Sequence, residues 1–211
     1  MNKVVFFDFD GVIIESANIK TEAFYELFLS YGKKNAAKAR EYHLNNQGRS
    51  RFEKFKFIFD NILFLPYTEK LKLSLSNKFS EIVFEKVVTC PFVSGILSFL
   101  EELKSKKIKT FLLSATPHEE LLEICRFRKI DFFFQRILGA PTTKVQHGKK
   151  ILSDLSLKSH QVIFFGDSTS DLEASQELGI NFIGVGDKYN NLFPKNVNII
   201  KNFERFTFEH L

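Results

Sequence analysis

The sequence predicts an α/β fold in which a doubly wound parallel sheet carries an inserted helical module. The apolar run at 4–7, Val-Val-Phe-Phe, is typical of a strand buried on both faces of a parallel sheet. Helical periodicity then fills residues 16–90 without strand-like alternation, and short strands alternate with helices after it. A crossover between parallel strands needs only one helix with short loops. We therefore expect residues 1–15 and 91–211 to form the core, and residues 16–90, the helical module, to be an insertion.

Three helices of the module are predicted from apolar residues spaced three and four positions apart. Those of the first helix are Phe24, Leu27, Phe28 and Tyr31. Those of the second helix are Phe52, Phe55 and Phe59. Those of the third helix are Leu71, Leu75, Phe79 and Ile82. Gly32 can end the first helix, and Pro66 separates the other two.

The second half of the chain has the alternating rhythm of parallel α/β units. Its predicted elements are a helix at 93–105, a strand at 109–113, a strand at 136–139, a helix at 146–155, a strand at 161–165, a helix ending at Leu178, a strand at 181–185 and a strand near 197–200. Thr116-Pro117-His118-Glu119 has the pattern of a capping box with proline at the first helical position, so a further helix is expected to start there.

Composition limits the classes of function that fit the chain. Of its 211 residues 44% are hydrophobic, including 26 Phe, which supplies a sizeable core and disfavours disorder. No apolar run is long enough to span a bilayer, and Asp8 and Asp10 interrupt the segment that a signal peptide would need. The net charge of +5 is scattered over lysines without interleaved aromatics, so no nucleic-acid partner is expected. Cys90 and Cys125 lack metal-ligand spacing and fit reduced packing thiols of a cytoplasmic protein.

Polar side chains follow four of the predicted strands. They are Asp8 and Asp10, Ser114, Lys144, and Asp167 and Asp171. The carboxyl ends of parallel strands meet at one edge of a sheet, where ligands of open α/β folds bind. Two close carboxylates at a buried strand end repel each other and call for an oxygen-binding cation such as Mg²⁺. Each residue alone fits an ordinary cap, turn or solvated position, but their joint arrival at one edge favours catalysis.

The motifs resemble those of the haloacid dehalogenase-like hydrolase superfamily, whose members are mostly phosphatases. The similar parts are Asp8-x-Asp10-Gly11-Val12, Ser114, a downstream lysine, and Gly166-Asp167-Ser168-x-x-Asp171. The helical module resembles the cap of the subgroup that contains β-phosphoglucomutase and phosphoglycolate phosphatase. The resemblance implies a Rossmann-like core with an inserted α-helical cap, Mg²⁺ as cofactor and a small phosphorylated metabolite as substrate.

The resemblance also implies roles for the carboxylates. Asp8 would attack phosphorus and form an aspartyl-phosphate. Asp10 would protonate the leaving oxygen and then take a proton from the hydrolytic water. Mg²⁺ would be held by the Asp8 carboxylate, the Asp10 backbone carbonyl and Asp167. Asp171 is expected to orient the lysine or a metal-bound water rather than to contact the metal.

Two further residues would act on the phosphoryl group. Ser114 lies before a helix start and would donate a hydrogen bond to the phosphoryl oxygens. For the lysine we assign Lys144, although many relatives place it directly before a proline, and Lys149 and Lys150 follow closely. The short turn after Pro141 favours Lys144, because the two later lysines fall in a helical pattern.

Gly48-Arg49-Ser50-Arg51 in the module resembles a substrate-specificity loop. Guanidinium groups at Arg49 and Arg51 would suit a second anionic group on the substrate. An arginine-bearing helix start that faces solvent explains the same pattern, and both readings stay open at this stage.

The function that fits best is a Mg²⁺-dependent phosphatase acting on a sugar phosphate or a short acid phosphate. A β-phosphoglucomutase-like phosphomutase uses the same residues and is the main alternative. A haloacid dehalogenase needs neither the second aspartate of the Asp8-x-Asp10 motif nor the metal site, and a non-enzymatic phosphoacceptor signalling domain lacks a helical insertion of this size. The sequence leaves monomer and homodimer equally open.

Overall fold

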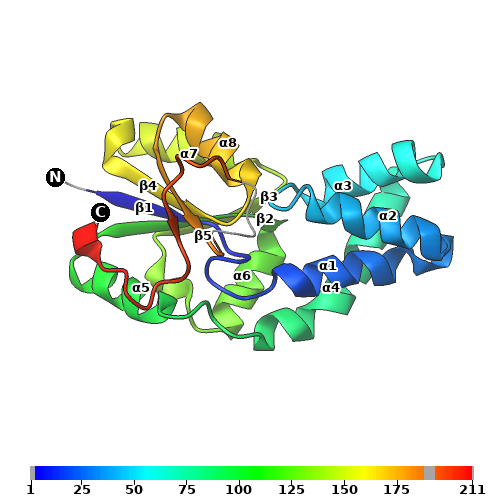
Figure 1. Ribbon diagram of the computed structural model, residues 1–211, viewed down its shortest axis with the longest axis horizontal. Helices are drawn as coiled ribbons and strands as arrows, with labels where there is room; N and C mark the ends of the chain where they lie inside the picture. Colours follow the sequence, from blue (N-terminus) through cyan, green and yellow to red (C-terminus); the bar gives the residue numbers. More distant parts are fainter. Residues whose placement is uncertain (1–2, 188–192, 211) are drawn as a thin grey trace.

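The computed structural model describes residues 3–187 and 193–210. Its centre is a six-stranded sheet in the order β3-β2-β1-β4-β5-β6, and each neighbouring pair is parallel (Figure 1). The strands are β1 (Val4–Phe7), β2 (Lys109–Pro117), β3 (Arg136–Ala140), β4 (Val162–Gly166), β5 (Asn181–Val185) and β6 (Ile199–Ile200). The predicted α/β class and parallel sheet are confirmed.

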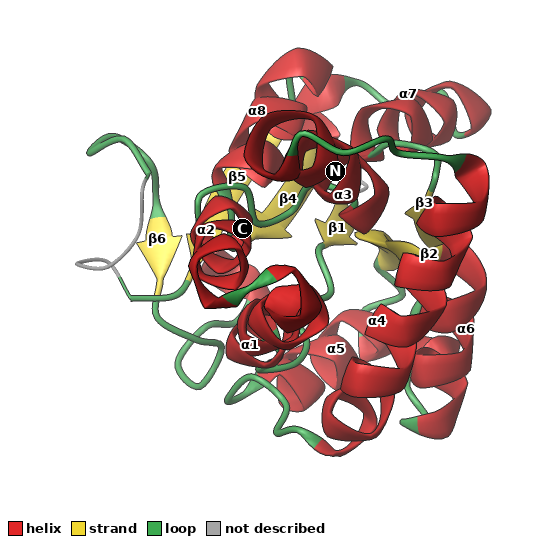
Figure 2. Cartoon of the chain, turned by 90° about the vertical axis from the view of Figure 1, so that its right-hand side faces the viewer, coloured by secondary structure: helices red, strands yellow, loops and turns green. Residues whose placement is uncertain are grey.

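Helices cover both faces of this sheet. They are α5 (Ile96–Ser105) and α6 (His118–Phe127) on one face, and α7 (Lys144–Asp154) and α8 (Thr169–Leu178) on the other. Figure 2 shows the two pairs above and below the strands. Strand β1 contributes side chains to the hydrophobic core on both faces of the sheet. Val5 and Phe7 pack in one cluster, and Val4 and Phe6 pack in the other. A strand apolar on both faces therefore lies at the centre of a doubly wound sheet.

The helical module follows β1 and lies at one end of the sheet (Figure 1). Its helices are α1 (Ala17–Phe28), α2 (Lys33–Leu44), α3 (Arg51–Ile58) and α4 (Glu69–Thr89), with a 3₁₀ turn at Leu29–Tyr31 and a π-helical turn at Phe59–Leu63. The predicted apolar spacing forms its core, where the rings of Phe24, Phe28, Phe55 and Phe79 contact one another. The exact core and module boundaries stay a prediction.

One local prediction is wrong. The strand expected to end at 113 continues to Pro117, because Pro117 pairs with Ala140 of β3 beyond an irregularity in the register. Helix α6 starts at His118, its N-terminal neighbour Pro117 is extended (ψ 139°), and no side-chain capping bond forms. The Thr116 hydroxyl contacts Asp10 instead of capping a helix. Strand pairing therefore overrides the local capping pattern.

Two other sequence observations have structural counterparts. Cys90 and Cys125 are both buried free thiols, as expected of packing residues. Within the described residues, no helix is both long and apolar enough to cross a membrane.

Candidate active site

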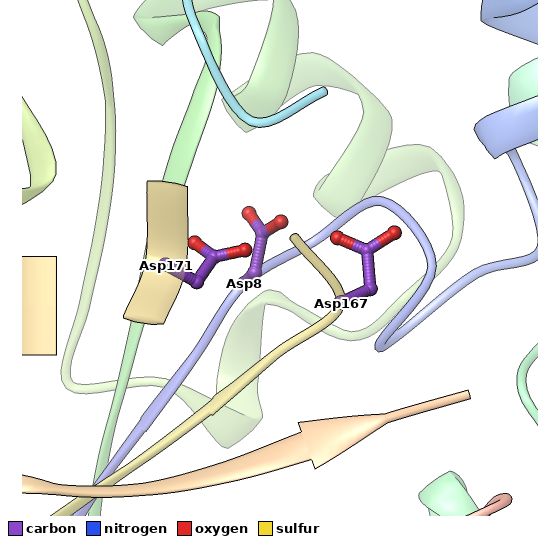
Figure 3. A group of neighbouring side chains, drawn as sticks. All are labelled: Asp8, Asp167 and Asp171. Carbon is purple, nitrogen blue, oxygen red and sulfur yellow. The ribbon is translucent and has the colours of Figure 1, made fainter. Parts of the chain in front are cut away.

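The candidate site lies where the strand order reverses, between β1 and β4. Asp8 directly follows β1 and Asp167 directly follows β4, so both stand at the carboxyl edge of the sheet. Asp171 joins them from the first turn of α8. One oxygen from each carboxylate lies within 4.8 Å of the others, and Figure 3 shows the three groups side by side. The predicted convergence of strand ends thus brings these carboxylates together.

Crowding of buried negative charge dominates the electrostatics of this cluster. Asp8 is only 3% exposed. Burial raises its pKa to about 7, with help from Asp171 and Asp10, while Lys144 opposes the shift. Burial, followed by repulsion from Asp8 and Asp171, likewise raises the pKa of Asp167 well above its ordinary value. Carboxylates that hold each other partly protonated are suited to a cation with hard oxygen ligands, so this donor set fits Mg²⁺.

Lys144 supplies the positive charge that the protein itself places in the cluster. It is the first residue of α7, whose start is fixed by a capping box between Thr143 and Gln146. Its Nζ lies 2.9 Å from Asp8 Oδ1 and 2.5 Å from Asp171 Oδ1. Burial alone would lower the pKa of Lys144, but Asp171 and Asp8 outweigh it and the pKa is raised. The ammonium group is therefore firmly protonated beside the candidate nucleophile.

The two later lysines point away from the site. Lys149 pairs with Glu177 at 2.7 Å, and its side chain is 61% exposed. Lys150 approaches Asp154 at 3.6 Å, and its side chain is 71% exposed. The structure thus places Lys144, and neither of its neighbours on α7, at the carboxylate cluster.

Asp171 is held by hydrogen bonds on both of its oxygens. Oδ1 accepts from Lys144, and Oδ2 accepts from the hydroxyl (2.6 Å) and the backbone N–H (3.2 Å) of Ser168. Gly166 makes room for it, since a Cβ there would lie 2.3 Å from Asp171 Cβ. A carboxylate with both oxygens occupied orients Lys144 better than it binds a metal.

Asp10 is the centre of a separate polar network. Its Oδ1 accepts from the Ser16 hydroxyl at 2.5 Å, and its Oδ2 accepts from Lys20 Nζ at 2.5 Å and from Thr116 Oγ1 at 3.2 Å. Lys20 also donates to Thr116 at 2.8 Å. Burial would raise the pKa of Asp10, but Lys20 and Ser16 outweigh it and lower the pKa. Asp10 is therefore an ionised base in this arrangement.

The glycine of the Asp8-x-Asp10-Gly11 motif has a steric reason. Gly11 has φ +74°, a left-handed conformation that side chains rarely adopt. A Cβ at this position would lie 2.1 Å from Asp167 Oδ2. The motif glycine therefore lets the carboxylate of β4 approach the end of β1.

Ser114 is buried near the end of β2, where its Oγ accepts a hydrogen bond from the Thr116 backbone N–H at 3.1 Å. It lines a cavity that Lys144 and Arg49 also line. The serine and the lysine predicted to contact a phosphoryl group therefore border one space.

The helical module covers the carboxylates. One cavity is lined from the core by Asp8, Asp10, Ala115, Thr116 and Asp167, and from the module by Ala17, Lys20, Phe24, His43, Gln47, Gly48, Arg49, Arg51, Lys54 and Phe79. The module also touches the core at Gly48, where a Cβ would lie 2.1 Å from Ser170 Oγ. This cavity connects the predicted nucleophile with the predicted specificity loop.

The two arginines of that loop differ in their surroundings. The exposed Arg49 lines both cavities. Arg51 is buried and bridges the module to the core, because its guanidinium donates to both carboxylate oxygens of Glu120 on α6 at 2.7 and 2.9 Å. It also donates to Ser80 of α4 at 2.7 Å. Arg51 already has a counter-ion, whereas Arg49 is open to a ligand.

Comparison with known proteins agrees with this geometry. A family model described as haloacid dehalogenase-like hydrolase matches residues 5–185. The chain belongs to this family.

Individual relatives of this hydrolase cover most of the chain. A phosphorylated carbohydrates phosphatase from Thermotoga maritima is 28% identical over 191 residues, which are 86% of this chain and 83% of the relative. A β-phosphoglucomutase from Clostridium difficile has a TM-score of 0.79 at 21% identity and covers 100% of this chain and 95% of its own. A predicted phosphoglycolate phosphatase from Haemophilus somnus has a TM-score of 0.74 at 18% identity, covering 96% and 95%. The structural likenesses confirm the Rossmann-like fold.

Several polar residues of this hydrolase's site were missed in the sequence. Ser16 and Lys20 are one helical turn apart, a spacing that could have placed both beside Asp10. Thr116 was assigned to a helix cap. Lys54 and Glu120 gave no signal, because Lys54 contacts His43 of another helix and Glu120 pairs with Arg51, 69 positions away.

Proposed function

We propose that this hydrolase is a Mg²⁺-dependent phosphatase that acts on a small phosphorylated metabolite through an aspartyl-phosphate at Asp8. The observation that carries the proposal is the buried Asp8 carboxylate, 2.9 Å from Lys144 Nζ and within a cluster that includes Asp167. An anionic nucleophile attacks a phosphate ester only when nearby cations offset its repulsion from the phosphoryl oxygens.

The first half-reaction transfers the phosphoryl group to the protein. An Asp8 carboxylate oxygen donates its electron pair to phosphorus, and the bond from phosphorus to the ester oxygen breaks. Lys144, held by Asp171, offsets the charge that the phosphoryl oxygens bring to Asp8. Ser114 and the backbone around it would donate hydrogen bonds to the same oxygens.

Asp10 would handle the protons of both half-reactions. In the first, a protonated Asp10 gives its proton to the departing ester oxygen, so it must gain that proton as the substrate arrives. In the second, the ionised form accepts a proton from the water that attacks the phosphorus of the aspartyl-phosphate, which releases inorganic phosphate. The hydrogen bonds from Ser16, Lys20 and Thr116 support the ionised form.

The Asp8 and Asp167 carboxylates and the Asp10 backbone carbonyl would hold the metal. When bound, Mg²⁺ would supply the positive charge that polarises the phosphoryl group and keeps Asp8 ionised. The raised pKa values of Asp8 and Asp167 support this assignment, because these carboxylates need a cation to ionise fully at neutral pH.

The relative from Thermotoga maritima supports a phosphorylated carbohydrate as substrate class. The phosphomutase remains the alternative because of the structural likeness to a β-phosphoglucomutase. Product analysis with sugar phosphates and Mg²⁺ separates the two. Inorganic phosphate released in a one-to-one ratio with substrate consumed supports the phosphatase, and an isomeric sugar phosphate without net phosphate release contradicts it.

Metal titration of two variants tests the carboxylate assignments. Asp167→Ala should raise the Mg²⁺ concentration for half-maximal activity about tenfold or more, since a metal ligand disappears. Asp171→Ala should mainly lower kcat at saturating Mg²⁺, because it releases Lys144. Activity on an aryl phosphate, measured across Mg²⁺ concentrations, gives both quantities. The reverse ranking would show that Asp171 binds the metal and Asp167 orients its surroundings.

The helical module is proposed to act as a cap that closes over the substrate, with Arg49 and Arg51 in different roles. Arg49→Ala should raise KM about fivefold for a metabolite with a second anionic group and less for an aryl phosphate. If Arg51 acts only through its ion pair with Glu120, then Arg51→Ala, Glu120→Ala and the double variant should all lose about the same activity. That loss should also be the same for the anionic metabolite and for the aryl phosphate. A selective loss for the anionic metabolite in Arg51→Ala would instead make Arg51 a direct substrate contact, as the sequence motif predicts.

A further inference from the structure

A buried lysine of the module stands out among the cations that line the cavity over Asp8. Lys54, on α3, is only 3% exposed. Its Nζ lies 3.1 Å from His43 Nδ1 on α2 and 5.5 Å from the centre of the Phe24 ring. Lys20 has Asp10 as counter-ion and Arg51 has Glu120. No carboxylate of residues 3–187 or 193–210 forms an ion pair with Lys54.

The electrostatics of Lys54 are those of a charge that lacks a partner. Burial, followed by repulsion from Lys20, lowers its pKa to about 7. Burial and Lys54 lower the pKa of His43 to about 2, so the imidazole is neutral and accepts from the ammonium through Nδ1. The groups whose charges act on Lys54 are Lys20, Asp10, Lys144 and Arg51, with His43 in direct contact. Of these only Asp10 is acidic, and Lys20 already neutralises it.

We propose that Lys54, oriented by His43, binds a second anionic group of the substrate in the cavity that also contains Asp8. This assignment rests on the proposed phosphatase function and narrows its substrate class. The substrates are phosphate monoesters that also carry a carboxylate or a second phosphate. The second anionic group of the substrate becomes the counter-ion of Lys54. The ester then lies between Lys54 in the module and Asp8 in the core.

A purely structural role does not account for a lysine at this position. A buried ammonium without a counter-ion costs free energy, whereas a methionine of similar length would pack against Phe24 at no such cost. The neutral His43 adds no charge that would compensate. An anion in the cavity gives the ammonium a charge-assisted hydrogen bond, which is the stronger kind.

Matched pairs of esters test the proposal. Glycerol phosphate is compared with phosphoglycerate, and glucose monophosphate with glucose bisphosphate, so one arm adds a carboxylate and the other a phosphate. The wild-type enzyme should prefer the anionic member of at least one pair in kcat/KM. Lys54→Met should reduce that preference about tenfold or more, mainly through KM, as expected for a lost charged hydrogen bond. Lys56→Met, on the exposed side of the same helix, should keep the wild-type preference.

Three results would overturn the assignment: no preference in the wild-type enzyme for either pair, equal losses on both members in Lys54→Met, or the same loss in Lys56→Met. If Mg²⁺-dependent hydrolysis occurs with the same kcat/KM for both members of each pair, only the role of Lys54 is rejected. If none of the esters is hydrolysed, the proposed phosphatase function is rejected, and the Lys54 assignment with it.

The melting temperature, Tm, gives a second readout. Replacing a lysine that stabilises the fold would lower the Tm, whereas replacing a buried lysine kept for ligand binding should raise it. Between about pH 7 and the ordinary lysine pKa of 10.5, Lys54 is protonated in the unfolded chain but not in the folded one. The free-energy cost of burying Lys54 therefore shrinks as the pH rises through this range. Lys54→Met should therefore raise the Tm, most at pH 7 and below, with the gain fading toward pH 10.5. A lower Tm at pH 7 in a variant that keeps its ester preference would show that Lys54 serves packing alone.

Discussion

Replacing Asp8 with Asn is expected to lower kcat on an aryl phosphate by about 10⁴-fold or more, the scale of loss seen when a covalent nucleophile is removed. The amide keeps the shape of the side chain but has no anionic oxygen to attack phosphorus. Asp8 is also the carboxylate that contacts Lys144 and, by our assignment, the metal. Initial rates at saturating Mg²⁺ measure the effect.

The matched control for this variant is Asp60→Asn, which removes a surface carboxylate that pairs with Lys56 in the module. It should retain wild-type rates. Circular dichroism and Tm values check that Asp8→Asn is folded. We expect it to fold, because the substitution removes one negative charge from a crowded acidic cluster. Near wild-type turnover in a folded Asp8→Asn enzyme would exclude Asp8 as the nucleophile.

Lys144→Ala is expected to lower kcat about a hundredfold or more, as when one preorganised charge-stabilising group is lost. Without the ammonium, Asp8 and Asp171 repel each other unscreened, and the pKa of Asp8 rises above its value of about 7. The phosphoryl oxygens then lose the cation that offsets their charge beside Asp8. Steady-state kinetics at saturating Mg²⁺ measure the loss.

Lys149→Ala and Lys150→Ala are the controls for this lysine, because both side chains point to solvent from the same helix. Both variants should stay near wild type. Added ethylammonium should partly restore Lys144→Ala by occupying the vacated space. Loss of activity in Lys149→Ala, with activity retained in Lys144→Ala, would show that Lys149 and not Lys144 is the catalytic lysine.

Much of the core could be predicted because its signals are local. The apolar run of β1 leads directly into Asp8 and Asp10, and parallel strands must present their ends at one edge. Lys144 was distinguished from its neighbours by the short turn that precedes it, and the structure places its ammonium beside Asp8. Gly179 follows Leu178, where the sequence predicts that this helix ends, and it caps α8 in the left-handed conformation.

Contacts between distant segments were out of reach of such signals. Thr116 lies 106 positions from Asp10, and a local capping pattern concealed its place in β2. Glu120 joins Arg51 only because α6 and α3 meet where the module contacts the core. Lys54 reads in sequence as one more lysine on an amphipathic helix, and only packing against His43 reveals that it is buried.

Trapping the phosphorylated protein tests the central claim most directly. An aryl phosphate needs little help from an acid, so an Asp10→Asn enzyme should still be phosphorylated but should hydrolyse the product slowly. Acid quenching followed by borohydride reduction converts an aspartyl-phosphate to homoserine, which peptide mass spectrometry can locate. We expect homoserine at position 8, in amounts that rise with substrate and Mg²⁺ and vanish in the Asp8→Asn, Asp10→Asn double variant. Substrate turnover with an unmodified Asp8, or with the modification at Asp10, Asp167 or Asp171, would contradict the account.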